Sequence, residues 1–257
     1  EWFGVGLGDD PPVRRSIRRS TRHVDRHHAD TPAFGQPRTF YNRRPTTRMG
    51  VEWEWRRSFF EAAQTKEPTK EHEVLRDALS GKVGVFVQAW ATQDIRTAVF
   101  LKEEMAREGF GEMRIVIDAG AEAWREPAML VRTGTAVVLP PMPAQGRTTD
   151  QAFYAADCAK VLQDNGVVIA LSAHDGSNPA GRLDVQAGLA MRGGLTRAQA
   201  LRAVTLAPAQ ILGIDDRVGT VEAGKDADLV LWNGEPFEAT SRPVGVLVGG
   251  HLVLDPR

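Results

Sequence analysis

The 257-residue sequence has one cysteine, Cys158, so no disulfide can form within the chain. It has no run of about 18 apolar residues, which a membrane-spanning helix needs, and no signal-peptide pattern follows its first residue, Glu1. The formal net charge is −1, so no bulk attraction draws the chain to nucleic acid or to a membrane surface. We therefore expect a soluble globular protein whose compartment the sequence does not identify.

Three parts differ in composition. Residues 1–50 are rich in proline and arginine and predict an irregular, basic N-terminal segment. Residues 51–213 predict the main domain, and residues 214–257 predict a small β appendage of short strands with glycine-rich turns. The basic cluster between Arg14 and Arg26 raises nucleic-acid contact as a weak alternative. No aromatic residue interleaves this cluster, which disfavours single-strand binding, so we favour a solvated or partner-bound segment.

The main domain alternates strands with helices. Residues 51–64 and 70–81 predict two amphipathic helices, after which four β–α units follow. The strands are continuous apolar runs, which predicts a parallel sheet buried on both faces in an α/β protein. Four units are half of an eight-fold barrel, so we predict a TIM-like (β/α) barrel, either whole or only its second half. The predicted strands span residues 82–89, 113–119, 135–141 and 167–173, and the helices 94–109, 122–134, 150–166 and 196–213.

The stretch that follows the last predicted strand carries a long motif, from residue 195 to residue 237. It resembles the closing segment of the amidohydrolase superfamily, more narrowly its imidazolonepropionase-like and dihydroorotase-like branch. The resemblance covers about residues 80–257 and implies a barrel of amidohydrolase type that ends in a small β appendage. The matching residues are Thr196, Ala200, Leu201, Thr205, Pro208, Ala209, Leu212, Gly213, Gly219, Gly224, Lys225, Ala227, Asp228, Leu229 and Val230.

The resemblance also implies a divalent-metal site at the carboxyl ends of the strands, where a metal-bound water attacks a carbonyl. Family members take ligands from an H-x-H pair on the first strand, from histidines on the fifth and sixth, and from an aspartate on the eighth. This chain has no H-x-H. Gln88 and Ala119 stand at the fifth- and sixth-strand positions, while His174 matches the eighth-strand aspartate and Asp175 follows it. Most of the ligand pattern is therefore missing.

The remaining candidates form a reduced site. His174 and Asp175 are the predicted catalytic residues, and with Asp118 they are the predicted metal ligands. Zinc is the expected ion if one binds, and a metal-free site is the alternative. Each candidate also has a structural interpretation, as a loop, turn or helix-capping residue. The predicted substrate-binding residues are Gln88, Arg147 and Arg182, and Glu122 is a further acidic candidate that could instead cap a helix.

The leading function is hydrolysis of a C–N bond in a small-molecule amide or cyclic amide. The alternative is a catalytically degenerate relative that acts as a binding or assembly subunit. A half barrel exposes two sheet edges, so we expect a homo-oligomer or a partner subunit.

Overall fold

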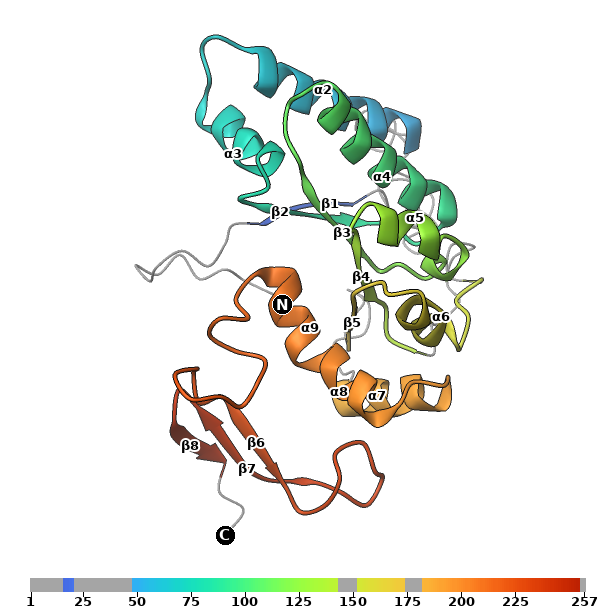
Figure 1. Cartoon of the computed structure of the whole chain (residues 1–257), viewed down its shortest axis with the longest axis vertical. Coiled ribbons are helices and arrows are strands. Elements are labelled where there is room, and N and C mark those ends of the chain that lie inside the picture. The colour runs from blue at the N-terminus through green and yellow to red at the C-terminus, as the bar shows by residue number, and fades with distance from the viewer. Residues whose placement is uncertain (1–15, 21–47, 143–151, 174–181, 255–257) are drawn as a thin grey trace, which may run out of the picture.

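The computed structural model describes residues 16–20, 48–142, 152–173 and 182–254. Within these ranges a five-stranded sheet carries helices, and a separate three-stranded sheet follows it at the far end from the first helices (Figure 1). None of the helices in these ranges combines the length and the apolar character needed to cross a membrane.

The larger sheet is parallel throughout, with its strands in chain order from β1 to β5. The four predicted strands are confirmed, because each apolar run contains one of β2 to β5. The prediction of an irregular segment over residues 1–50 is wrong at β1, which pairs with β2 along its whole length. The strands are β1 (Ser16–Ser20), β2 (Gly84–Gln88), β3 (Arg114–Asp118), β4 (Ala136–Leu139) and β5 (Ile169–Leu171).

The helices largely follow the predicted pattern, with two breaks and one late start, because the helix predicted over residues 150–166 begins only at Cys158. Pro127 divides the helix predicted over residues 122–134, because proline lacks an N–H and fits only the first turn of a helix. Thr205, with φ −128° and ψ −82°, divides the helix predicted over residues 196–213. The helices are α2 (Arg48–Gln64), α3 (Lys70–Leu79), α4 (Thr92–Arg107), the 3₁₀ turn η2 (Ala123–Arg125), α5 (Pro127–Arg132), α6 (Cys158–Asp164), α7 (Leu183–Arg192), α8 (Arg197–Val204) and α9 (Leu206–Leu212).

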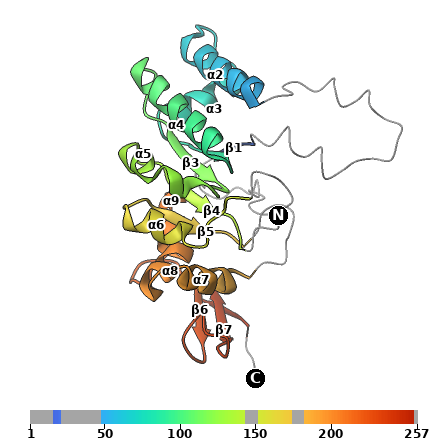
Figure 2. The ribbon, with the colours of Figure 1, turned by 90° about the vertical axis from the view of Figure 1, so that its right-hand side faces the viewer.

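The two faces of the parallel sheet have different covers. One face packs against α4, α5 and α6, which lie along one side of the strands (Figure 2), and forms the main core. The side chains that it contributes are Val85, Val87, Ile115, Ile117, Val137, Leu139, Ile169 and Leu171.

On the opposite face, Val116 and Ala170 pack against Ile211 of α9. Because side chains alternate along a strand, Gln88 and Asp118 belong to this second face. In the described residues β1 and β5 stand at the two edges of the sheet. The structure therefore shows an α/β fold, and in the described residues the parallel sheet does not close into a barrel.

The three-stranded antiparallel sheet lies where short strands were predicted after residue 213. Gly249 and Gly250 join its last two strands with φ angles of 55° and 80°, a turn that favours glycine. The loop before β7 contacts the main domain, where Phe237 packs on the core and Arg197 forms ion pairs with two glutamates of the loop. The strands are β6 (Leu229–Trp232), β7 (Pro243–Val248) and β8 (His251–Leu254).

Candidate functional site

Two of the predicted site residues lie side by side at the carboxyl edge of the parallel sheet. Gln88 ends β2 and Asp118 ends β3, and the two are register partners on adjacent strands. Both are half-buried. In parallel α/β proteins this edge holds the chemistry, because the loops that follow the strands converge there.

Three other predicted residues, His174, Asp175 and Arg147, lie outside the described residues. The described chain before them ends at this edge, since β5 ends at Leu171 and the Ser172 amide donates to the Leu139 carbonyl at 3.0 Å. Their roles stay predictions.

The backbone turns sharply after Asp118. Ala119, which stands where the family pattern has a histidine, has a φ of 62°, a left-handed conformation that non-glycine residues rarely adopt. At Gly120 an added Cβ would come within 2.6 Å of Val137 Cγ1, so only glycine fits this position without a shift of the core. The turn keeps Ala119 buried beneath the edge and leaves Asp118 as the last residue of β3.

Glu122 serves the structural role that the sequence left as an alternative, but on a different helix. Its carboxylate accepts hydrogen bonds from the backbone N–H of Thr92, at 3.0 Å, and from the Thr92 hydroxyl, at 2.6 Å. Arg125 lies 3.8 Å away. Glu122 is 7% exposed. It therefore caps the start of α4, the helix of the preceding β–α unit, where a negative charge is favourable.

We expect Glu122→Gln to lower the free energy of unfolding by about 1–2 kcal/mol, because a charge-assisted cap becomes a neutral one in a buried setting. Chemical denaturation measures the change. Glu61→Gln is the matched control, since Glu61 is exposed and its ion pair within the described residues is the i,i+4 pair with Arg57. The control should lose less than about 0.5 kcal/mol. Equal losses for the two variants would contradict the capping role.

Arg182 is exposed and forms a local ion pair at the start of α7. Its Nε donates to Asp184 Oδ1 at 3.1 Å, and this hydrogen bonding holds the pKa of the Asp184 carboxyl below its ordinary value. In the structure Arg182 is thus a surface residue whose described partner is Asp184. Its binding of a substrate carboxylate stays a prediction.

Two residues that sequence analysis missed hold the loop after β4. The Tyr154 hydroxyl donates to the Pro140 carbonyl at 2.9 Å, and burial raises the pKa of Tyr154 well above its ordinary value. The side-chain amide of Gln186 bonds to both backbone groups of Met142. A signal for Gln186 exists in the sequence, because it shares a helix with the buried Ala187 and Ala190. A polar residue on an apolar helix face needs a partner.

The described donors at the carboxyl edge do not fit zinc by themselves. Among the described residues, no three histidine, cysteine or acidic side chains come together. Asp118 and Gln88 offer a carboxylate and an amide, whereas zinc sites in proteins are built mainly from imidazole and thiolate. A metal here would need His174 and Asp175.

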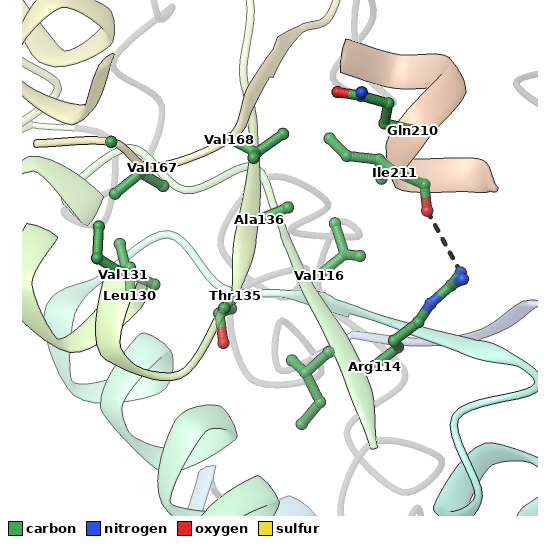
Figure 3. A pocket seen from close by; sticks show the side chains of 13 residues that line it. Arg114, Val116, Leu130, Val131, Thr135, Ala136, Val167, Val168, Gln210 and Ile211 are labelled. Carbon is green, nitrogen blue, oxygen red and sulfur yellow. Dashed lines mark hydrogen bonds between the residues drawn. The ribbon is translucent and has the colours of Figure 1, made fainter. Parts of the chain in front are cut away.

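A cavity of about 240 Å³ lies at the opposite, amino-terminal edge of the sheet, between α9 and the ends of β3, β4 and β5 (Figure 3). Val116, Ala136, Val168 and Ile211 line it, and Arg114 Nη2 donates to the Ile211 carbonyl at 3.4 Å. None of the described residues lining this cavity carries a carboxylate, an imidazole or a thiol. The cavity therefore has no group for acid–base chemistry, and the candidate site is the carboxyl edge.

Cys158 is a core residue. Its thiol lies 3.9 Å from the Ala121 carbonyl oxygen, and burial raises the pKa of Cys158 to about 12 because the thiolate would lose its solvation.

This pKa predicts a loss of stability in alkaline solution. The unfolded thiol ionises near pH 8.5–9 while the folded thiol stays protonated, so the unfolded state binds fewer protons and the free energy of unfolding falls as pH rises. Between pH 8 and pH 10 the expected loss from this residue is about 1.5 kcal/mol. Comparing the pH dependence of wild type and Cys158→Ala isolates the effect. Identical slopes for the two proteins would contradict it.

Comparison with known proteins identifies the family. Residues 111–253 match the model of the amidohydrolase family. An amidohydrolase of Hapsidospora irregularis is 27% identical over 244 residues, which cover 82% of this chain and 24% of that protein. The imidazolonepropionase of Sphingopyxis alaskensis is 36% identical over 87 residues, covering 32% of this chain and 22% of that protein. The chain thus spans about a quarter of the length of the curated relatives it matches.

Comparison with solved structures supports the same family. An amidohydrolase from Thermotoga maritima is 30% identical, with a TM-score of 0.75 over 86% of this chain and 61% of that one. An adenosine deaminase from Xanthomonas campestris with bound zinc is 21% identical, with a TM-score of 0.52 over 67% of this chain and 46% of that one, and shows likeness of fold alone. The family match covers more than half of the chain and includes β3, β4, β5 and all but the last residue of the three-stranded sheet. The chain belongs to the amidohydrolase family.

Proposed function

We propose that the chain hydrolyses a C–N bond of an amide or a cyclic amide at the carboxyl edge of its parallel sheet. Family membership supports a hydrolase of the amidohydrolase superfamily. The observation that carries the proposal is the in-register pair Gln88 and Asp118 on one face of that edge. A carboxylate and an amide placed together can activate water and orient a peptide-like group.

In the proposed reaction, water adds to the carbonyl carbon as a carboxylate takes its proton, and the C–N bond then breaks as the nitrogen is protonated. Asp118 is the carboxylate that the described residues place at the edge, and Asp175 is a second one from the sequence. Gln88 would hydrogen-bond the amide of the substrate. Arg147 or Arg182 would pair with a carboxylate on the substrate, where bidentate geometry adds specificity.

The proposal includes a divalent metal, with zinc as the first choice. His174 and Asp175 would bind this ion together with Asp118. When bound, such an ion makes water more acidic. Elemental analysis of protein purified without chelators or metal affinity resin tests this. We expect bound metal that is lost in His174→Ala and in Asp175→Ala. Absence of metal after incubation with excess zinc would contradict the metal site and leave the metal-free reaction as the proposal.

The function itself is tested by turnover of a panel of open-chain amides, cyclic amides and an imidazolone, the last chosen because relatives are named imidazolonepropionases. Wild type should release product from at least one compound, and Asp175→Ala should lower kcat/KM at least about 100-fold. Asp216→Asn is the control, since Asp216 is exposed and lies after α9, far along the chain from Asp118 and Asp175. No turnover across the panel by folded protein would favour a binding or assembly subunit.

Self-association or a partner subunit stays part of the proposal. In the described residues the parallel sheet ends in two open edges, and all four residues of β8 are exposed. Unpaired strand edges and exposed apolar strands favour association. Light scattering after size exclusion should show a mass above that of one chain, and a compact monomer would contradict this.

A further inference from the structure

Gln186 makes a paired contact that ties helix α7 to the backbone that follows β4. It lies in α7 and is 8% exposed. Its Oε1 accepts from the Met142 backbone N–H at 2.6 Å, and its Nε2 donates to the Met142 carbonyl at 2.9 Å. One side-chain amide thus satisfies both backbone groups of Met142.

The two partners of this contact lie near the carboxyl edge of the parallel sheet. Met142 follows the end of β4, whose Val138 is the register partner of Asp118. Gln186 stands in the first turns of the helix that follows β5. The contact therefore joins the backbone that leaves β4 to the helix that follows β5, at the edge where Asp118 lies.

The contact between Gln186 and Met142 has little support from apolar packing on α7, because the neighbouring buried residues Ala187 and Ala190 are small. The Tyr154 hydroxyl holds the same backbone segment at the Pro140 carbonyl, two residues before Met142. Without Gln186 the Met142 N–H and carbonyl would have to find solvent or new partners, since buried polar groups are rarely left unpaired. The loop would then have Tyr154 as its remaining side-chain tie among the described contacts.

We propose that Gln186 is a positioning residue of the candidate active site, which holds the backbone that leaves β4, at Met142, against α7 and so fixes its position at the carboxyl edge beside Asp118. This inference rests on the proposed hydrolase function for its catalytic part. Gln186 need not touch substrate. It acts through the backbone of Met142.

Two substitutions separate positioning from mere packing. Gln186→Met keeps the size of the side chain and removes both hydrogen bonds. Gln186→Glu keeps the shape and makes the donor depend on pH, because a protonated carboxyl both donates and accepts whereas a carboxylate only accepts. Burial raises the pKa of a carboxyl group, so the switch should occur above the ordinary value of about 4.3.

The first measurement is hydrogen exchange in peptides that contain Met142. Gln186→Met should lower their protection at least about tenfold, and Gln163→Met should not change it. Gln163 is the matched control because it is a half-buried glutamine in α6 whose side chain makes no hydrogen bond within the described part of the chain. Unchanged protection in Gln186→Met would overturn the proposal.

The second measurement is the pH profile of kcat/KM on an amide that the wild type hydrolyses. Relative to wild type at each pH, Gln186→Glu should be about tenfold slower at pH 8 and should recover as pH falls, while Gln163→Glu follows wild type throughout. Lost protection with an unchanged pH profile would overturn the positioning role and leave a structural clamp. If wild type hydrolyses nothing, the proposed function fails by itself, and exchange alone then decides whether Gln186 holds the loop.

Discussion

Replacing Trp90 by alanine should lower the free energy of unfolding by about 3–5 kcal/mol, the usual loss for a large aromatic side chain removed from a core. Trp90 is 1% exposed and packs against Ala119, Ala121 and Tyr154 directly beneath the carboxyl edge. Its removal leaves a cavity where the loops after β2, β3 and β4 meet. Chemical denaturation measures the loss.

Trp53→Ala is the matched control for this variant. Trp53 lies in α2, is 55% exposed, and has the guanidinium of Arg57 at 5.3 Å from its ring centre. Its replacement should cost less than about 1 kcal/mol, because only surface packing and an exposed cation–π contact are lost. Similar costs for the two tryptophans would mean that the cluster around Trp90 does not stabilise the edge.

Replacing Asp118 by asparagine should lower kcat/KM by about 100-fold or more on any amide that the wild type hydrolyses. The substitution keeps the shape of the side chain and removes the negative charge that accepts a proton from water. Because Asp118 is half-buried at the end of β3, the free energy of unfolding should change far less than the rate. Steady-state kinetics and denaturation of the same preparation separate the two effects.

Two outcomes would contradict a catalytic role of Asp118. If Asp118→Asn retains wild-type kcat/KM while Asp175→Ala does not, the base is Asp175 and Asp118 is structural. If both variants retain activity, the chemistry lies away from the carboxyl edge.

The strands of the parallel sheet could be predicted because burial on both faces leaves a local trace, an unbroken apolar run such as the one around Val137. Strand β1 could not, since its sequence Ser-Ile-Arg-Arg-Ser is short and basic and gains its conformation from pairing with β2. Strand propensity depends on such tertiary context. The break at Pro127 was readable from the sequence, because proline disfavours a helix interior.

The candidate site likewise has a part that the sequence predicted and a part that it did not. The placement of Gln88 and Asp118 at one edge followed from the ends of two predicted strands. The roles of Glu122 and Gln186 did not, because their partners lie 30 and 44 residues away in sequence. A local pattern marks a buried polar residue but does not name the backbone group that it meets.

Hydrolysis of the amide panel in ¹⁸O-labelled water, followed by mass spectrometry, tests the central claim most directly. Hydrolysis of a C–N acyl bond predicts that the carboxyl group formed carries one oxygen from the solvent and that the amine, released or freed within the same molecule when a ring opens, carries none. The rate of labelling should fall about 100-fold or more in Asp118→Asn. Folded wild-type protein that yields no labelled acid from any amide in the panel would contradict the assignment of amide hydrolysis to this chain.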